Sequence, residues 1–127
     1  MSITEISDKI LEVHDGIRWV IVTDPKGRIV VEKKKEHVTS YLTEDAMKND
    51  RELWITCIQG MITNVARYWG APQHLHIQFK KITLFGFPCM GGSVIVTAEP
   101  DVPLSVINKI QEILTRFMQE QPSVKHE

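Results

Sequence analysis

Apolar side chains recur along this chain with two periods, one typical of helices and the other of strands. Residues 3–13 place isoleucine and valine at helical spacing, behind a serine and a glutamate that can form a capping box, which predicts a short first helix. The run 17–23 (IRWVIVT) is almost continuously apolar and rich in β-branched residues, which predicts a strand buried on both faces. The turn residues of 24–27 (DPKG) favour a hairpin whose second strand covers 28–34.

The next predicted element is a long helix over 43–69 with an unusually wide apolar arc. Thr43, followed by two acids, suits its N-terminus. The apolar stripe contains Trp54, Ile58, Met61, Val65 and Trp69, and the opposite polar stripe contains Glu52, Thr56, Gln59, Thr63 and Arg67. With its flanking apolar residues the arc is wider than a helix needs to cover a sheet, so we expect it also to contact a second copy of the chain.

Further strands and a final helix complete the pattern. The segment 74–79 alternates polar and apolar residues, which predicts a half-exposed strand, and two more apolar strands are predicted at 82–87 and 93–98. Asp101 can cap a closing helix whose apolar face extends over 104–118. The predicted order is α-β-β-α-β-β-β-α.

Composition bounds the architecture and the partners. The chain has 127 residues, the size of one domain, which we place at 1–120 with a polar tail at 121–127. Its formal net charge is −1, from 15 basic and 16 acidic residues, which argues against a nucleic-acid partner. No apolar run reaches the roughly 20 residues of a membrane-spanning helix, and no secretory leader is recognisable. We therefore expect a cytoplasmic protein with reduced thiols and no membrane partner.

The element order and several stretches of sequence resemble the Roadblock (dynein light chain) superfamily. The matching stretches are ILEVHDGIRWVIVTDPKGRIV over the first helix and hairpin, KKITLFGFP in the fourth strand and GGSVIVTAEPDVPLSVINKIQEIL at the end. Together with the helix between them they cover about residues 3–118. Within or beside that superfamily, the chain looks most similar to a group of archaeal proteins of unknown function.

The resemblance implies an α+β domain with a five-stranded antiparallel sheet of order 2-1-5-4-3. One long helix would cover one face of that sheet, and the terminal helices would cover the other. It also implies a homodimer that pairs through the third strand and the long helix. Such proteins act as non-enzymatic regulators or scaffolds for small GTPases or larger complexes, so a small GTPase is the implied partner.

The two predicted edge strands support the same dimer. The lysines of 33–35 either form a basic patch for an acidic partner or, as we favour, guard the edge of 28–34 against pairing. The segment 74–79 has no charge before Lys80 and no proline, so its edge is free to pair. The predicted dimer seam consists of His74, His76, Gln78, Trp54, Cys57, Ile58 and Met61.

Candidate catalytic and metal-binding residues are few. His74 and His76 share one face of a strand but would need a third ligand to hold zinc, so we favour plain polar side chains there. Cys57 lies on the apolar arc and is expected in the core, whereas Cys89 is expected to be exposed in a loop at 88–92. Neither thiol has a recognisable neighbouring base. The sequence thus predicts no enzyme activity, no metal and no cofactor.

A small-molecule sensor of the PAS or GAF type is the alternative function. In such a domain a ligand lies between the sheet and the helices, and Arg18, Thr83 and Thr97 are the polar groups that could contact it. The many large apolar residues argue against a cavity of the ~300–1,000 Å³ that ligand sites usually have.

Overall fold

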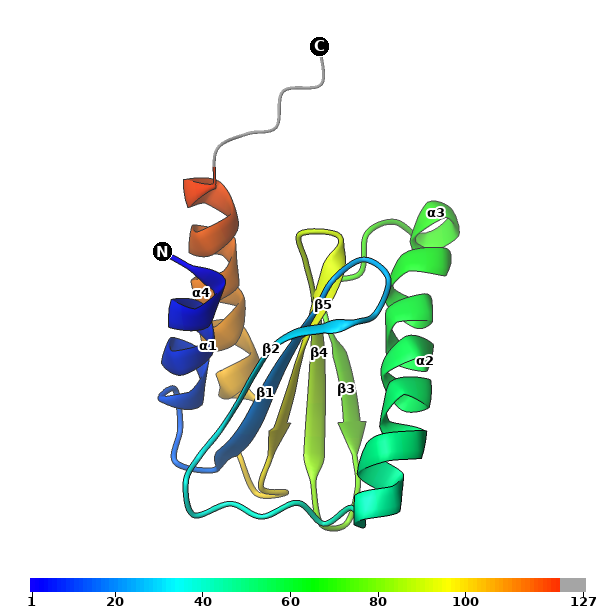
Figure 1. The fold of residues 1–127 in the computed structure, drawn as a ribbon. Coiled ribbons are helices and arrows are strands. Elements are labelled where there is room, and N and C mark those ends of the chain that lie inside the picture. Colours follow the sequence, from blue (N-terminus) through cyan, green and yellow to red (C-terminus); the bar gives the residue numbers. More distant parts are fainter. Residues whose placement is uncertain (122–127) are drawn as a thin grey trace.

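The computed structural model describes residues 1–121, and its elements follow the predicted order (Figure 1). They are α1 (Ile3–Leu11), β1 (Ile17–Thr23), β2 (Ile29–Lys34), the π-helical turn η1 (Ala46–Asp50), α2 (Arg51–Asn64), α3 (Ala66–Trp69), β3 (Leu75–Gln78), β4 (Thr83–Cys89), β5 (Gly92–Ala98) and α4 (Ser105–Glu120). The strands form one antiparallel five-stranded sheet in the order β2-β1-β5-β4-β3. The α+β architecture and strand order are therefore confirmed, while most of the predicted tail, 122–127, lies outside the described residues.

Helices cover both faces of the sheet, as expected. In Figure 1, α1 and α4 lie side by side on one face, and α2 lies on the other. Phe85 and Phe87 of β4 are buried in the core cluster on the α1 side, together with Ile6 of α1. Ile21 and Ile95 belong to the second cluster, beneath α2. Because the central strands are buried on both faces, their sequences are almost continuously apolar.

The expected turn and cap chemistry is present near the N-terminus. The Ser2 hydroxyl accepts a hydrogen bond from the Glu5 N–H at 3.1 Å, which caps α1. In the β1–β2 hairpin, the Asp24 carbonyl accepts from the Gly27 N–H at 2.9 Å, as in a type I turn. The Asp24 carboxylate accepts from the Arg28 backbone N–H at 3.0 Å, and this bond is the largest of the contacts that lower the pKa of Asp24.

The predicted long helix over 43–69 is divided in the structure. Thr43 begins it as expected, since its hydroxyl accepts from the Ala46 N–H at 3.1 Å, but the first turn is the π-helical η1. Near the other end, α2 stops and α3 follows as a separate short helix. The Thr63 hydroxyl donates to the Gln59 carbonyl at 2.8 Å, a contact that competes with the helical ladder and bends helices.

The connection between β4 and β5 is shorter than predicted. We expected a loop over 88–92, but β4 continues through Cys89 and β5 begins at Gly92. Met90 and Gly91 form the turn between them, with φ of 54° and 81°. Positive φ at both central residues is the signature of a tight type I′ hairpin, and Gly91 supplies the second without strain.

The final helix starts slightly later than predicted. α4 begins at Ser105 without a side-chain cap, rather than directly after Asp101. Two of its first N–H groups have backbone acceptors: Val106 N–H donates to the Pro103 carbonyl at 3.1 Å, and Ile107 N–H donates to the Leu104 carbonyl at 3.0 Å. Within residues 1–121, no helix has the length and apolar character needed to cross a membrane.

Candidate interaction surface

Helix α2 carries apolar side chains on two of its sides. Ile55, Ile58 and Ile62 face the sheet and are buried. On the outer side Leu53 is 66% exposed, and Met61, which lines the groove between α2 and the sheet, is 48% exposed. The helix therefore has more apolar surface than its own sheet covers, which leaves an exposed apolar face on α2.

An open apolar groove lies between α2 and the sheet. Its volume is about 550 Å³, and its wall is formed almost entirely by apolar side chains, among them Trp19 and Ile21 of β1, Trp54 and Met61 of α2, and Ile77 of β3. This volume falls in the range typical of small-molecule sites. The expectation that large side chains would leave no such cavity is therefore wrong, because those side chains line the space instead of filling it.

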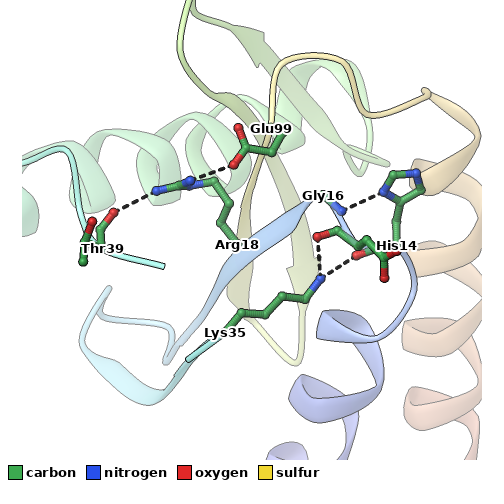
Figure 2. A network of polar contacts seen from close by, with 7 residues as sticks. His14, Gly16, Arg18, Lys35, Thr39 and Glu99 are labelled. Atoms are coloured by element: carbon green, nitrogen blue, oxygen red, sulfur yellow. Dashed lines mark hydrogen bonds and ion pairs between the residues drawn. The ribbon is translucent and has the colours of Figure 1, made fainter. Parts of the chain in front are cut away.

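Cationic side chains gather where residues 39–42 cross one end of the groove. Figure 2 shows Arg18 reaching from β1 to the Glu99 carboxylate at 2.7 Å and to the Thr39 carbonyl at 2.8 Å. The Tyr41 ring lies 4.7 Å from the Arg18 guanidinium carbon and 5.6 Å from the Lys81 ammonium nitrogen. Both distances are within the range of cation–π contacts, so the tyrosine lies between two cations.

A second set of contacts, also drawn in Figure 2, ties Lys35 to the loop after α1. Its ammonium group donates to the carbonyls of His14 at 2.7 Å and Asp15 at 2.9 Å. Burial lowers the pKa of Lys35, and the Asp15 carboxylate opposes that shift. The Gly16 N–H donates to His14 Nδ1 at 2.8 Å, and the Gly16 carbonyl accepts from the Glu99 N–H at 2.8 Å. The Lys35 contacts hold the segment after β2 against the loop between α1 and β1.

Polar contacts at both ends of α2 set its position over the sheet. Near its start, the Glu32 carboxylate of β2 accepts from the Trp19 indole N–H at 2.7 Å and from the Arg51 guanidinium. Near its end, the buried Gln59 amide donates to the Gly91 carbonyl at 3.1 Å. Gln59 was expected on the exposed polar stripe; that expectation is wrong, because the side chain is needed to anchor the helix to the β4–β5 turn.

The two edge strands differ as predicted. β2 is one edge of the sheet, and each of its lysines contacts another group. Lys33 lies 3.7 Å from the Asp8 carboxylate, and Lys34 donates to the Val38 carbonyl at 2.9 Å. β3 is the other edge and pairs only with β4 among the strands of residues 1–121, and its four residues carry neither lysine nor proline.

The side chains of β3 point alternately to the two faces of the sheet. The His76 ring lies 5.2 Å from the Phe85 ring, and His74 lies 6.5 Å from Phe87, so both imidazoles are on the α4 side. The Gln111 amide of α4 contacts His74 Nδ1 at 3.4 Å. Among residues 1–121 no group of three His, Cys, Asp or Glu side chains is arranged to hold a metal ion.

The backbone of β3 presents alternate residues to its open edge. The Phe79 N–H donates to the Ile82 carbonyl at 2.8 Å, which closes the β3–β4 hairpin. Hydrogen-bonded and non-bonded pairs alternate along an antiparallel ladder, so the N–H and C=O groups of Ile77 point toward β4. Those of His76 and Gln78 then point outward, where they can pair with another strand.

The predicted seam residues occur on both sides of this open edge. His74, His76 and Gln78 lie along it on the α4 side, and the Gln78 side-chain oxygen accepts from the Thr83 hydroxyl at 2.8 Å. On the other side, the α2 residues of the set do not form one exposed patch. Ile58 is only 4% exposed and supports the surface from beneath, while Trp54 is half-buried in the groove wall.

The expectations for the two cysteines are both wrong. Cys57 was expected in the core but is exposed on α2, where it lines the groove together with Met61. Cys89 was expected in an exposed loop but is buried in β4, at 3% exposure. Burial raises the pKa of the Cys89 thiol from 9.0 to about 11. Cys57 is thereby available at the predicted seam, and Cys89 is a core thiol.

The sequence patterns predicted no role for the segment before η1, residues 36–42. Tyr41 and Leu42 line the groove although both are exposed. Two adjacent large apolar residues in a segment without helical or strand periodicity were the available signal. Of the polar groups proposed for a sensor site, Arg18 and Thr97 line the groove, whereas Thr83 is buried and bonded to Gln78.

The fold was compared with known proteins. No family model and no curated protein sequence matches the chain. Solved structures do match: the gliding protein MglB from Thermus thermophilus is 14% identical with a TM-score of 0.66, over 92% of this chain and 88% of that one. A Roadblock/LC7 domain from Streptomyces avermitilis is 10% identical with a TM-score of 0.66, over 94% and 96%. The chain has the Roadblock/LC7 fold.

A further structure extends the likeness over nearly the whole chain. MglC from Myxococcus xanthus is 10% identical with a TM-score of 0.66, and the match covers 95% of this chain and 100% of that one. The Roadblock-like architecture expected from the sequence is thus confirmed at the level of the fold. The narrower likeness to archaeal proteins stays a prediction.

Proposed function

We propose that this Roadblock-fold chain is a non-enzymatic interaction module that works as a homodimer. The observation that carries the proposal is the unpaired edge of β3, which lies beside an α2 face whose apolar side chains are exposed. An open strand edge with no lysine and no proline favours pairing with another strand. In the Roadblock resemblance, the third strand and the long helix are also the dimer elements.

Pairing along β3 would use backbone groups that no other strand of residues 1–121 occupies. The outward groups of His76 and Gln78 would bond to the same strand of a second copy and continue the sheet. Leu53, Cys57 and Met61 of the two copies would then be covered at the same interface. A two-fold axis makes such an interface self-complementary, which is the commonest arrangement of soluble homo-oligomers. One of the similar structures is described as MglB with a tetrameric arrangement, which supports self-assembly of this fold.

The partner of this dimer is proposed from the Roadblock resemblance alone. That resemblance implies a small GTPase or a larger complex that contains one. The test is capture of partner proteins from the native source by the tagged dimer. Each captured partner is then loaded with GDP or with a non-hydrolysable GTP analogue, and its binding to the dimer is compared between the two nucleotides. Binding that changes with the nucleotide supports a GTPase partner, and capture of proteins without nucleotide binding contradicts it.

The dimer is tested by a proline substitution at the open edge. His76→Pro removes an outward N–H and leaves the β3–β4 ladder intact, so we expect a folded monomer by sedimentation at micromolar concentration. Val30→Pro is the matched control, because Val30 is an exposed residue of the opposite edge strand without a partner in the β1–β2 register. It should remain a dimer. A wild-type chain that sediments as a monomer, or a His76→Pro variant that still dimerises, would contradict the proposed seam.

A second candidate function, a small-molecule sensor, is favoured by the groove of about 550 Å³ between α2 and the sheet. The groove is open at its mouth and apolar along its wall, and it resembles a ligand site in size. Cys57 and Met61 line this groove and also belong to the proposed seam, so ligand binding is measured on both the wild-type chain and the His76→Pro variant to distinguish the two functions.

A further inference from the structure

We propose that the groove beneath α2 binds the anion of a long-chain carboxylic acid. The acyl chain would lie between α2 and the sheet, and the carboxylate would lie at Lys81 and Arg18. The inference rests on the second candidate function and names its ligand class. It follows from three properties of the groove: its apolar wall, the sign of its charges, and the tyrosine that lies between its cations.

The wall of the groove suits a long apolar chain. It takes aromatic and aliphatic side chains from α2 and from three different strands, including Trp54, Trp19, Ile77 and Leu84. Most of its length offers no hydrogen-bonding partner among the described residues, so a polar ligand would lose its hydration without compensation there. An unbranched acyl chain has no polar group to desolvate and can follow an open groove.

The charges at the groove have one sign. Within the described part of the chain, its charged lining residues are Arg18, Arg51 and Lys81, with no Asp or Glu beside them. Arg18 is already paired with Glu99 at 2.7 Å, and Arg51 is paired with Glu32. Lys81 differs from both, because among residues 1–121 no carboxylate lies within ion-pair distance of its ammonium group. The groove therefore has an uncompensated positive charge at its end, which selects an anionic head group.

Tyr41 occupies the place where that head group would lie. Its ring is 4.7 Å from the Arg18 guanidinium and 5.6 Å from the Lys81 ammonium, yet the residue is 59% exposed. It belongs to a segment without regular structure between β2 and η1. A carboxylate in place of the ring would exchange two cation–π contacts for charge-assisted hydrogen bonds, which are stronger. Movement of Tyr41 away from the cations is thus the expected structural response to binding.

Binding can be measured with sodium dodecanoate at concentrations below its aggregation threshold. Two of the three tryptophans, Trp19 and Trp54, line the groove, so their fluorescence should change saturably with the ligand. Trp69 is 86% exposed and lies outside the groove, so a Trp69→Phe variant removes fluorescence that does not report on the groove. We expect one ligand per protomer, and an affinity that rises roughly fourfold for each added methylene until the groove is filled.

The head-group contact is tested by a pair of neighbouring lysines. Lys81→Gln should weaken dodecanoate binding about tenfold or more, the usual effect of losing a charged hydrogen bond. Lys80→Gln is the matched control, because Lys80 lies in the same turn but does not line the groove, and it should bind like the wild type. Dodecanol, which has the same chain without the charge, should bind the wild type more weakly than dodecanoate does.

Several outcomes would overturn the inference. Equal loss of affinity in both lysine variants, or equal binding of dodecanol and dodecanoate, would show nonspecific adsorption to apolar surface. Binding to the His76→Pro monomer but not to a wild-type dimer would show that a second copy fills the groove. If dodecanoate bound neither the wild-type dimer nor the His76→Pro monomer, the proposed ligand class would be excluded. The dimer proposal would be unaffected, because it is tested by sedimentation.

Discussion

The most informative perturbation is chemical labelling of the two native thiols, since the structure places them opposite to what their sequence positions suggest. Cys57 is exposed on α2 and lines the groove, and Cys89 is buried in β4. A maleimide added to the native protein should therefore modify Cys57 rapidly and leave Cys89 unmodified. The chain carries its own internal control, because both thiols belong to the same molecule and experience the same reagent.

The expected difference in rate can be worked from the thiolate fraction and the exposure. The pKa of Cys89 is raised from 9.0 to about 11, so near neutral pH its thiolate fraction is about a hundredfold lower than that of a thiol with the ordinary value. The thiolate is the species that reacts with maleimide, so the labelling rate of Cys89 should be at least about a hundredfold lower than that of a thiol with the ordinary pKa. The 3% exposure of Cys89 lowers the rate further, because the reagent must wait for β4 to open.

The assay is time-resolved labelling at about pH 8, read by mass spectrometry of the two cysteine-containing peptides. In denaturant both thiols should react at similar rates, which establishes that the peptides are equally detectable. Labelling of Cys89 as fast as Cys57 in the native protein would refute the placement of β4. The same assay reports on the dimer: Cys57 should become protected as the protein concentration rises, and His76→Pro should abolish that protection.

The remaining predictions concern stability. The folded pKa of Cys89, about 11, exceeds the ordinary value of 9.0, so between these pH values the folded state keeps a proton that the unfolded state has lost. Stability should therefore fall as pH rises through this window, by up to about 2–3 kcal/mol, and urea titrations of Cys89→Ala should lack this part of the slope. Gly92→Ala should destabilise the protein by about 3 kcal/mol or more, because the new Cβ would lie 2.0 Å from the Thr23 carbonyl oxygen. Gly60 lies in the interior of α2, and a Cβ added there would have its nearest contact at 3.5 Å. Gly60→Ala should therefore stabilise the fold by about 0.5–1 kcal/mol. Thermal melts in which the midpoints of both glycine variants shift in the same direction would contradict these contacts.

The strands themselves could be predicted because their signals are local and mutually consistent, whereas their order in the sheet was implied by the Roadblock resemblance. The apolar run of β1 and the DPKG turn define the first hairpin from adjacent residues alone. The central position of β1 follows from its burial on both faces, which the continuous apolar run required. The lysines of β2 and the alternating residues of β3 then identify the two edges. Each of these inferences depends on short segments and on rules that distant residues rarely override.

The environments of the helix residues could not be predicted in the same way. A helical stripe shows which residues share a side but does not show which stripe faces the sheet when apolar residues cover most of the circumference. In α2 the side that faces the sheet carries Ile55, Ile58 and Ile62 together with Gln59, whose amide donates to the Gly91 carbonyl. With Gln59 directed inward, Cys57 necessarily turns outward. Cys89 was misplaced for a similar reason, since the turn at Met90 and Gly91 is tighter than the proline before it suggested.

The anchoring of α2 also explains why the groove and the exposed helix face occur together. The buried Gln59 and Ile62 hold the later part of the helix to the sheet, whereas Trp54 and Trp19 are large side chains that line the groove beneath the earlier part. A ligand in the groove and a second copy at the seam would therefore contact the same helix, and Cys57 and Met61 belong to both surfaces. Any shift of α2 that favours one of them must alter the affinity for the other by the same factor, because coupling between two binding equilibria is reciprocal. The dimerisation constant measured with and without dodecanoate thus gives the sign and the size of the coupling between the two proposed surfaces.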